Sequence, residues 1–113
     1  MSLEKTEQRI EIRDQQELLG ILGRNDEFLR IMQSGMTCTL VARGNVIVIS
    51  GEEESVALAE QLLSELLFLY RQGLPITAHD VRYSVRMIAE GRQASLHRMF
   101  AETILVTNRG RQI

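Results

Sequence analysis

The chain has 113 residues, a hydrophobic fraction of 44% and a formal net charge of −2, which predict one compact domain and argue against wholesale disorder. No apolar run approaches the length of a membrane-spanning helix, and the polar N-terminus lacks the pattern of a signal peptide. The lone cysteine, Cys38, excludes an internal disulfide framework and fits a reducing cytosol. We therefore expect a cytoplasmic protein without a membrane segment.

Charge is distributed unevenly along the chain. Residues 1–70 hold six Lys/Arg and twelve Asp/Glu, a net charge of −6, whereas residues 71–113 hold seven arginines and three acidic residues, a net charge of +4. Such an asymmetry favours an anionic partner, or an acidic domain, near the C-terminal third. Solvated helix faces explain the same arginines equally well.

The first residues predict a strand followed by a short helix. Residues 9–13 alternate charged and apolar side chains, as a half-buried strand does. Asp14 is expected to cap the helix. Its side chains directed to the core are expected to be Leu18, Leu19 and Leu22.

Two glycines three residues apart, Gly20 and Gly23, are expected to form the turn into a second helix. Asn25 is the expected N-cap of that helix, and Gly35 is expected to end it in the left-handed conformation. Its apolar face is expected to hold Phe28, Leu29 and Met32.

A β-hairpin and a long helix come next. Strand patterns cover residues 36–42 and 46–49, and Gly44-Asn45 between them is a typical two-residue hairpin connection. Residues 50–53 have the spacing of a capping box at the start of the long helix, which stops at residues 73–75. The apolar positions of this helix repeat every three or four residues: Val56, Ala59, Leu62, Leu63, Leu66, Leu67 and Tyr70.

The C-terminal part predicts two helical stretches and a strand. Thr77 is the expected N-cap of a helix that Gly91 ends, with Asp80 at the reciprocal capping position. The buried positions of this helix are expected to be Val81, Val85 and Ile88. A short helical stretch around Leu96, Met99 and Phe100 precedes a final strand over residues 103–107.

The order of elements through residue 70 is β-α-α-β-β-α, which is the order of type I KH domains. We therefore predict an α+β, KH-like core over residues 8–71. A C-terminal helical extension with a final short strand is expected over residues 76–107. In KH domains a Gly-x-x-Gly turn between the first two helices brings backbone close to a nucleic-acid strand, an approach that a side chain would block.

Several segments resemble the N-terminal region of PhoH-like proteins, in order and with the spacing of that family. They are GRNDEFL (23–29), VARGN (41–45), ISGEEE (49–54), ITAHDVR (76–82), AEG (89–91) and ILVTNRG (104–110). The resemblance implies a cytoplasmic bacterial ATP-binding protein associated with phosphate starvation. That family pairs a KH-like N-terminal part with a P-loop ATPase module, and RNA-directed roles have been proposed for it.

The chain departs from that family because it contains no Gly-x-x-x-x-Gly-Lys-Ser/Thr motif, and its only lysine is Lys5. Without that loop there is no cradle of amides and no lysine for the phosphates of ATP. We therefore expect a non-catalytic N-terminal fragment of a longer protein that itself holds no cofactor. ATP and Mg²⁺ are expected only in the ATPase domain, which is absent from this chain.

No other residue set predicts chemistry. His79 and His97 lie on separate helical patterns with no cysteine nearby, so they do not make a zinc ligand set. The glutamates at residues 52–54 suit the positive end of the long helix, which explains them without a metal. No nucleophile and base have a spacing that predicts catalysis, and we expect no enzyme activity in this chain.

Single-stranded RNA is the expected ligand if the KH resemblance extends to function. Gly20 and Gly23 would form the turn, Arg24 would be the nearest positive charge, and Arg43 in the hairpin would reach the opposite wall. Two or three phosphate contacts predict weak, salt-sensitive binding with a dissociation constant of roughly 10⁻⁴ to 10⁻⁶ M. Aspartate at both glycines is expected to abolish this affinity while leaving the fold intact.

Arg82 and Arg86 lie one turn apart on the last long helix, away from its buried positions. They would contact RNA, or they would contact the ATPase domain. The alternative function is accordingly a protein–protein, oligomerisation or regulatory docking domain without nucleic-acid binding. The expected partners are therefore single-stranded RNA, the ATPase domain of the same protein and a second copy, but not a membrane.

Overall fold

A three-stranded antiparallel sheet forms one side of the molecule in the computed structural model, which describes residues 5–92 and 95–102. Its strands are β1 (Lys5–Glu11), β2 (Thr39–Arg43) and β3 (Val46–Glu52), in the spatial order β1-β3-β2. The central strand β3 pairs with both neighbours, so that Val48 lies opposite Arg9 on one side and Val41 on the other. The hairpin connection at Gly44-Asn45 is confirmed.

The strand β1 begins earlier than predicted, at Lys5, and ends at Glu11. The reason lies outside its own sequence, because β3 continues to Glu52 and supplies partners for the first residues of β1. Ile12 follows the strand, where its N–H donates to the Asn45 carbonyl oxygen at 2.8 Å and its side chain is buried.

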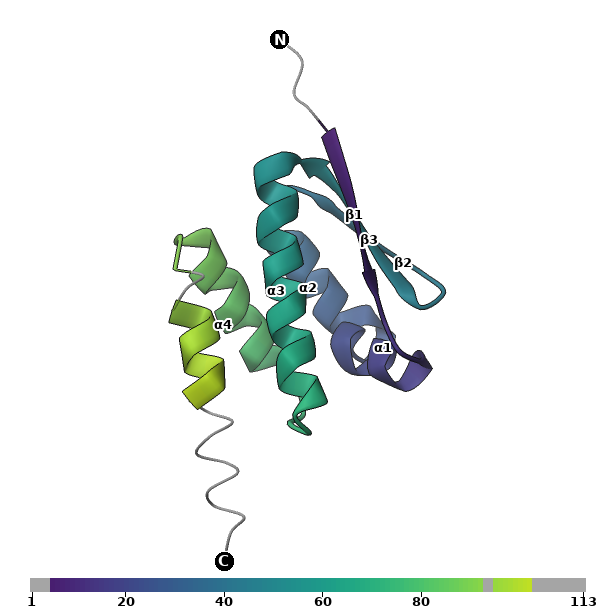
Figure 1. Cartoon of the computed structure of the whole chain (residues 1–113), viewed down its shortest axis with the longest axis vertical. Coiled ribbons are helices and arrows are strands. Elements are labelled where there is room, and N and C mark those ends of the chain that lie inside the picture. The colour runs from purple at the N-terminus through teal and green to yellow at the C-terminus, as the bar shows by residue number, and fades with distance from the viewer. Residues whose placement is uncertain (1–4, 93–94, 103–113) are drawn as a thin grey trace, which may run out of the picture.

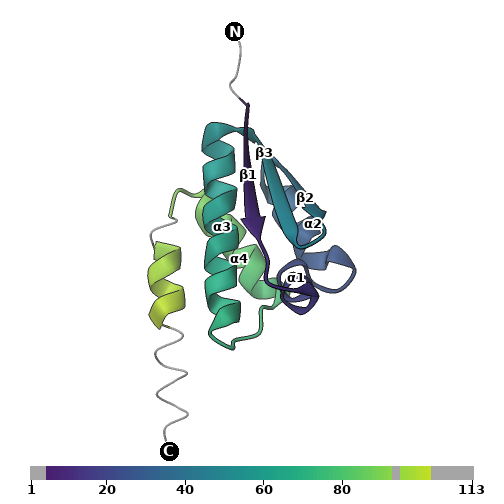
Figure 2. The ribbon, with the colours of Figure 1, turned by 45° about the vertical axis from the view of Figure 1, so that its right-hand side comes forward.

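Three helices follow on one side of this sheet: α1 (Gln15–Leu22), α2 (Glu27–Gly35) and α3 (Glu53–Arg71). α2 and α3 contact the strands, and α1 packs against these two helices. Asp14 caps α1 as predicted, since its Oδ1 accepts a hydrogen bond from the Glu17 N–H at 2.8 Å. α3 packs along β1 and β3, as Figures 1 and 2 show. The element order β-α-α-β-β-α and the α+β, KH-like fold are confirmed.

The helix α4 (Ala78–Ala89) and a further helix over residues 95–102 lie on the side of α3 that faces away from the sheet (Figure 1). The predicted capping box of α4 is present, with Thr77 and Asp80 exchanging two hydrogen bonds of 3.1 and 3.2 Å. Because α3 has the sheet on one side and these helices on the other, most of its circumference is buried. This explains why its apolar positions form so wide a band.

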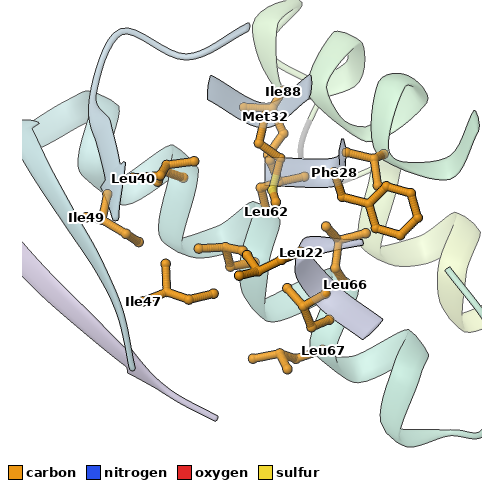
Figure 3. Packing of buried hydrophobic residues seen from close by; sticks show 14 of the residues in the cluster. Leu22, Phe28, Met32, Leu40, Ile47, Ile49, Leu62, Leu66, Leu67 and Ile88 are labelled. Atoms are coloured by element: carbon orange, nitrogen blue, oxygen red, sulfur yellow. The ribbon is translucent and has the colours of Figure 1, made fainter. Parts of the chain in front are cut away.

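The core lies between the sheet, α3 and the helices around it, and Figure 3 shows its centre. Ile47 and Ile49 of β3 are fully buried because they face the helices. Burying one such side chain stabilises a fold by about 1.5–3 kcal/mol. The other buried residues labelled there are Leu22, Phe28, Met32, Leu40, Leu62, Leu66, Leu67 and Ile88.

Several local predictions were wrong. Leu19 is 59% exposed, whereas α1 buries Leu22, as predicted, together with Ile21. Residues 50–53 make no capping box, because residue 50 remains paired in β3 and Glu52, the residue before α3, makes no side-chain capping hydrogen bond. The others concern Gly35 and the turn between α1 and α2 and are described below.

Gly35 is the last residue of α2 and does not have the positive φ of a left-handed residue. Met36, the C-cap residue, follows it in extended conformation. Its role is close packing of α2 against α4. A Cβ at Gly35 would lie 2.2 Å from Val85 Cγ1, so only glycine allows the two helices this approach. The predicted strand over residues 103–107 lies outside the described residues, and the division into residues 8–71 and 76–107 stays a prediction.

Candidate nucleic-acid interface

The turn between α1 and α2 consists of residues 23–26 and does not begin at Gly20. Gly20 belongs to α1, which continues to Leu22. Gly23 ends that helix with a φ of 81°, and its N–H donates to the Leu19 carbonyl oxygen at 2.7 Å. A short 3₁₀ helix, η1 (Arg24–Asp26), completes the turn and leaves Arg24 exposed. The predicted Gly20–Gly23 turn is therefore wrong in position by three residues.

Both glycines have a packing role in the structure. A Cβ at Gly20 would lie 2.4 Å from Cε1 of Tyr70, so the glycine lets α1 approach the aromatic ring on α3. A Cβ at Gly23 would lie 2.8 Å from Cγ of Phe28, and its positive φ disfavours any side chain. Aspartate at both positions would disturb these contacts. The expectation that the double variant leaves the fold intact is therefore withdrawn, and an RNA-binding test needs other residues.

The shape of the turn depends on two polar residues whose role was not predicted. Asn25 and Asp26 have φ values of 55° and 58°, a left-handed conformation that asparagine and aspartate tolerate better than most residues. The predicted N-cap role of Asn25 is wrong, since α2 begins at Glu27 with no side-chain cap. The guanidinium of Arg30 instead donates to the Asn25 carbonyl oxygen. The consecutive Asn-Asp after a glycine was the sequence signal for this turn.

The outer edge of β2 lies beside α2. The Gln33 amide binds this edge twice, donating to the Cys38 carbonyl oxygen at 2.6 Å and accepting from the Leu40 N–H at 2.8 Å. Because outward-facing peptide groups alternate along an antiparallel strand, the next ones belong to Ala42. Within residues 5–92 and 95–102, the peptide N–H and C=O of Ala42 on this edge have no protein partner.

The two positively charged residues that were predicted to flank the RNA, Arg24 and Arg43, lie in different parts of the molecule. Arg24 follows the C-terminal end of α1. Near the other end, Gln15 donates from Nε2 to Oδ1 of Asn45 at 2.7 Å and holds the hairpin turn there. The eight residues of α1 separate these two points by about 12 Å. Arg43, beside the hairpin turn, projects from the face of the sheet opposite to the helices, because it pairs with Val46 on that face.

Arg82 and Arg86 are both exposed on α4. Val85, between them in the sequence, contacts Gly35 at the C-terminal end of α2, whereas the turn of residues 23–26 precedes its N-terminal end. The two arginines therefore lie toward the opposite end of α2 from Arg24. The side chain that the structure does bring to the turn is Arg30, which the sequence analysis did not single out.

An ion pair fixes α1 to the end of α3. Glu17 is 3% exposed and accepts two hydrogen bonds of 2.9 Å from the Arg71 guanidinium and a third, also 2.9 Å, from the Arg13 N–H. The Arg71 hydrogen bond is the main reason that the pKa of Glu17 is lowered to about 2, against the opposing effect of burial. The same pairing raises the pKa of Arg71. Because Glu17 and Gly20 are both on α1, this pair and the Tyr70 contact set the position of the helix that leads into the turn.

The two histidines lie apart, on α4 and on the helix of residues 95–102. His97 Nδ1 is 2.7 Å from Oε1 of the buried Glu65, and His79 stacks on Tyr83. Among the described residues no three His, Cys, Asp or Glu side chains gather as metal ligands, and no helix there is long and apolar enough to cross a membrane.

The comparisons with known proteins identify the family. A PhoH-like protein of Bacillus subtilis (strain 168) is 31% identical to this chain over 102 residues, which are 90% of the chain and 32% of that protein. A PhoH-like protein of Mycobacterium leprae (strain TN) is 41% identical over 71 residues, or 63% of the chain and 20% of that protein. The chain belongs to the PhoH-like family.

A further PhoH-like protein, from Mycobacterium tuberculosis (strain ATCC 25618 / H37Rv), is 39% identical over 71 residues. The PhoH-like chain described here thus spans between a fifth and a third of the length of the curated relatives that it matches. No protein-family model and no solved structure matches it. The relatives are therefore consistent with a domain of a larger protein.

Proposed function

We propose that this chain is a non-catalytic, KH-like domain that binds a short single-stranded RNA weakly and positions it for the rest of a longer PhoH-like protein. The observation that carries the proposal is the open edge of β2 at Ala42, which lies beside α2. The turn before α2 carries the exposed Arg24, and the exposed Arg30 of α2 donates to the Asn25 carbonyl oxygen in this turn. A strand edge offers peptide groups to base edges, and arginines offer charge to phosphates.

The same surface limits the affinity. Asp26 and Glu27 are exposed next to the two arginines, so the local net charge of residues 24–30 is zero. Phosphate contacts are thus restricted to the two guanidinium groups themselves. The binding constant of a single strand falls with salt with a logarithmic slope of about −0.7 for each contact, so two contacts predict about a sevenfold loss between 50 and 200 mM salt.

The test is fluorescence-anisotropy titration of the chain with short labelled single-stranded RNAs at these two salt concentrations. Arg24→Glu is expected to abolish saturable binding or to halve the salt slope. Arg98→Glu makes the same change of charge on the exposed face of the helix over residues 95–102 and is expected to bind like the wild type. Equal losses in both variants, or no binding of the wild type at 50 mM salt, would overturn the proposal.

A second candidate function is docking of the rest of the longer protein, which would hold any ATP and Mg²⁺. A hollow between the end of α3, the start of α4 and the helix of residues 95–102 favours it. The residues that line this hollow are Leu69, Leu74, Pro75, His79, Asp80, Tyr83, Met99 and Phe100. Two of them, Met99 and Phe100, belong to the last described helix. Calorimetric titration with the separately produced remainder of a longer relative tests it, and His79→Glu is expected to weaken the heat of binding.

A further inference from the structure

No helix or strand of residues 5–92 and 95–102 covers the face of the sheet opposite to the helices (Figures 1 and 2). The register places eleven side chains on it, in three rows of three and a fourth row of two, Lys5 and Glu52, beyond the start of β2. Its centre is apolar, because Val46 and Val48 are half-buried and Val41, at 38%, is one of two exposed large hydrophobic residues among those described. The remaining side chains of this face are Lys5, Glu7, Arg9, Glu11, Thr39, Arg43, Ser50 and Glu52.

The charges at the two edges of this face are complementary within one row. Glu11 of β1 and Arg43 of β2 both pair with Val46 of β3, so they lie at opposite ends of the same row. Nε of Arg9 is 3.3 Å from Oε2 of Glu7, so Arg9 has an ion-pair partner on its own strand. Glu11 and Arg43 are both exposed, and neither forms an ion pair within the part of the chain that the structure describes.

We infer that this face packs against the same face of a second copy of the chain, about a two-fold axis parallel to the strands. That rotation places β3 over β3 and β1 over β2 of the other copy. Val46 and Val48 then meet their own equivalents at the centre. Glu11 of each copy lies opposite Arg43 of the other, so the dimer contains this contact twice.

The alternative two-fold axis, perpendicular to the strands, gives a poorer match. It would place Arg9 over Arg9 and Glu7 over Glu11, which are like charges in the middle of the face. The axis parallel to the strands leaves one like-charge contact, Glu52 over Glu52, at the end of β3. RNA is a poorer occupant than a second copy, because the face carries three glutamates and no aromatic ring on which a base could stack. Aligned packing of two sheets through an apolar centre is the arrangement of β-sandwiches.

The size of the face predicts a weak dimer. Eleven residues are roughly half or less of the 20–30 residues that each partner contributes to a standard interface. We therefore expect a dissociation constant on the order of 0.1–1 mM for the isolated chain. The longer protein would strengthen the contact wherever its other parts hold two copies together.

Sedimentation equilibrium of the 113-residue chain without RNA, at concentrations up to about 1 mM, tests the inference. Glu11→Arg and Arg43→Glu are each expected to weaken dimerisation by about tenfold or more, because both symmetric contacts become repulsive. The double variant Glu11→Arg/Arg43→Glu restores the opposite charges and is expected to return the dissociation constant to within about threefold of the wild type.

Arg98→Glu changes charge off this face and serves as the matched control, with an unchanged dissociation constant. Val48→Asp removes the apolar centre and is expected to give a monomer at all concentrations, while circular dichroism reports that its fold is retained. A wild-type chain that is monomeric at about 1 mM, or single charge reversals without effect, would overturn the inference. Because this experiment contains no RNA, its result does not depend on whether the chain binds RNA.

Discussion

The ion pair between Glu17 and Arg71 is expected to stabilise the fold by about 2 kcal/mol at neutral pH. The pKa of Glu17 falls from its ordinary value of 4.5 to about 2, and each pKa unit corresponds to about 1.4 kcal/mol, or about 3 kcal/mol in all. One third of the Arg71 side chain is exposed, so solvent screening reduces that figure to about 2 kcal/mol. Glu17→Gln keeps the shape and an oxygen for the Arg13 N–H but removes the charge.

The assay is urea unfolding of the wild type and Glu17→Gln at a series of pH values. At pH 7 the midpoint of the variant is expected to fall by about 1 M urea, for a slope of about 2 kcal/mol per molar. Since the pKa of Glu17 is lower in the folded chain, the stabilisation is complete above about pH 5 and is lost as the pH falls toward 2. The two proteins should therefore converge in stability near pH 2.

The exposed Glu54, in the first turn of α3, gives a matched control. Glu54→Gln removes one carboxylate near a helix N-terminus and is expected to cost only about 0.3–1 kcal/mol. If Glu17→Gln destabilises no more than Glu54→Gln, or if its stability difference from the wild type stays constant down to pH 2, the assigned role of the ion pair is refuted.

Three further predictions concern packing, backbone and the thiol. Gly35→Ala is expected to destabilise the fold by about 1–2 kcal/mol because its Cβ would overlap Val85 Cγ1. This cost should vanish in a Val85→Ala background. A double-mutant cycle that shows no coupling between the two positions would contradict the prediction. Asn25→Val is expected to lower the stability of the fold by about 1–2 kcal/mol, because Asn25 is left-handed, whereas Asn25→Gly should not destabilise the fold. Equal thermal stability of the two variants would contradict the left-handed conformation of residue 25. Cys38 is 2% exposed and burial raises the pKa of its thiol, so thiol reagents should modify it far more slowly in the native chain than in urea, and equal rates would contradict its burial.

Much of the fold was predictable because it depends on short-range interactions. The cap at Asp14, the capping box at Thr77 and the hairpin at Gly44-Asn45 each involve residues close in the sequence. The same holds for the repeat of apolar residues that predicted α3 and its burial. The amino-acid sequences of the PhoH-like segments predicted the family, and the relatives confirm it.

The candidate site was predicted less well because its geometry depends on residues distant in the sequence. Gly20 is in a helix and not in the turn, and the contact that requires a glycine there comes from Tyr70. The residues that shape the turn are instead Asn25 and Asp26. Arg43 lies at the predicted hairpin, but the pairing of β2 with β3 directs it to the uncovered face of the sheet.

The sequence by itself determined the order of the elements, some of their ends and the family, because caps, turns and apolar periodicity act over a few residues. Only the tertiary structure decided which residues on distant elements meet. It joined Glu17 to Arg71 across 54 positions of the chain and aligned Glu11 with Arg43 in one row of the sheet. A shift of one residue in the register of a strand would move its side chains to the other face of the sheet, so the packing of the core against β3 selects which side chains the uncovered face presents.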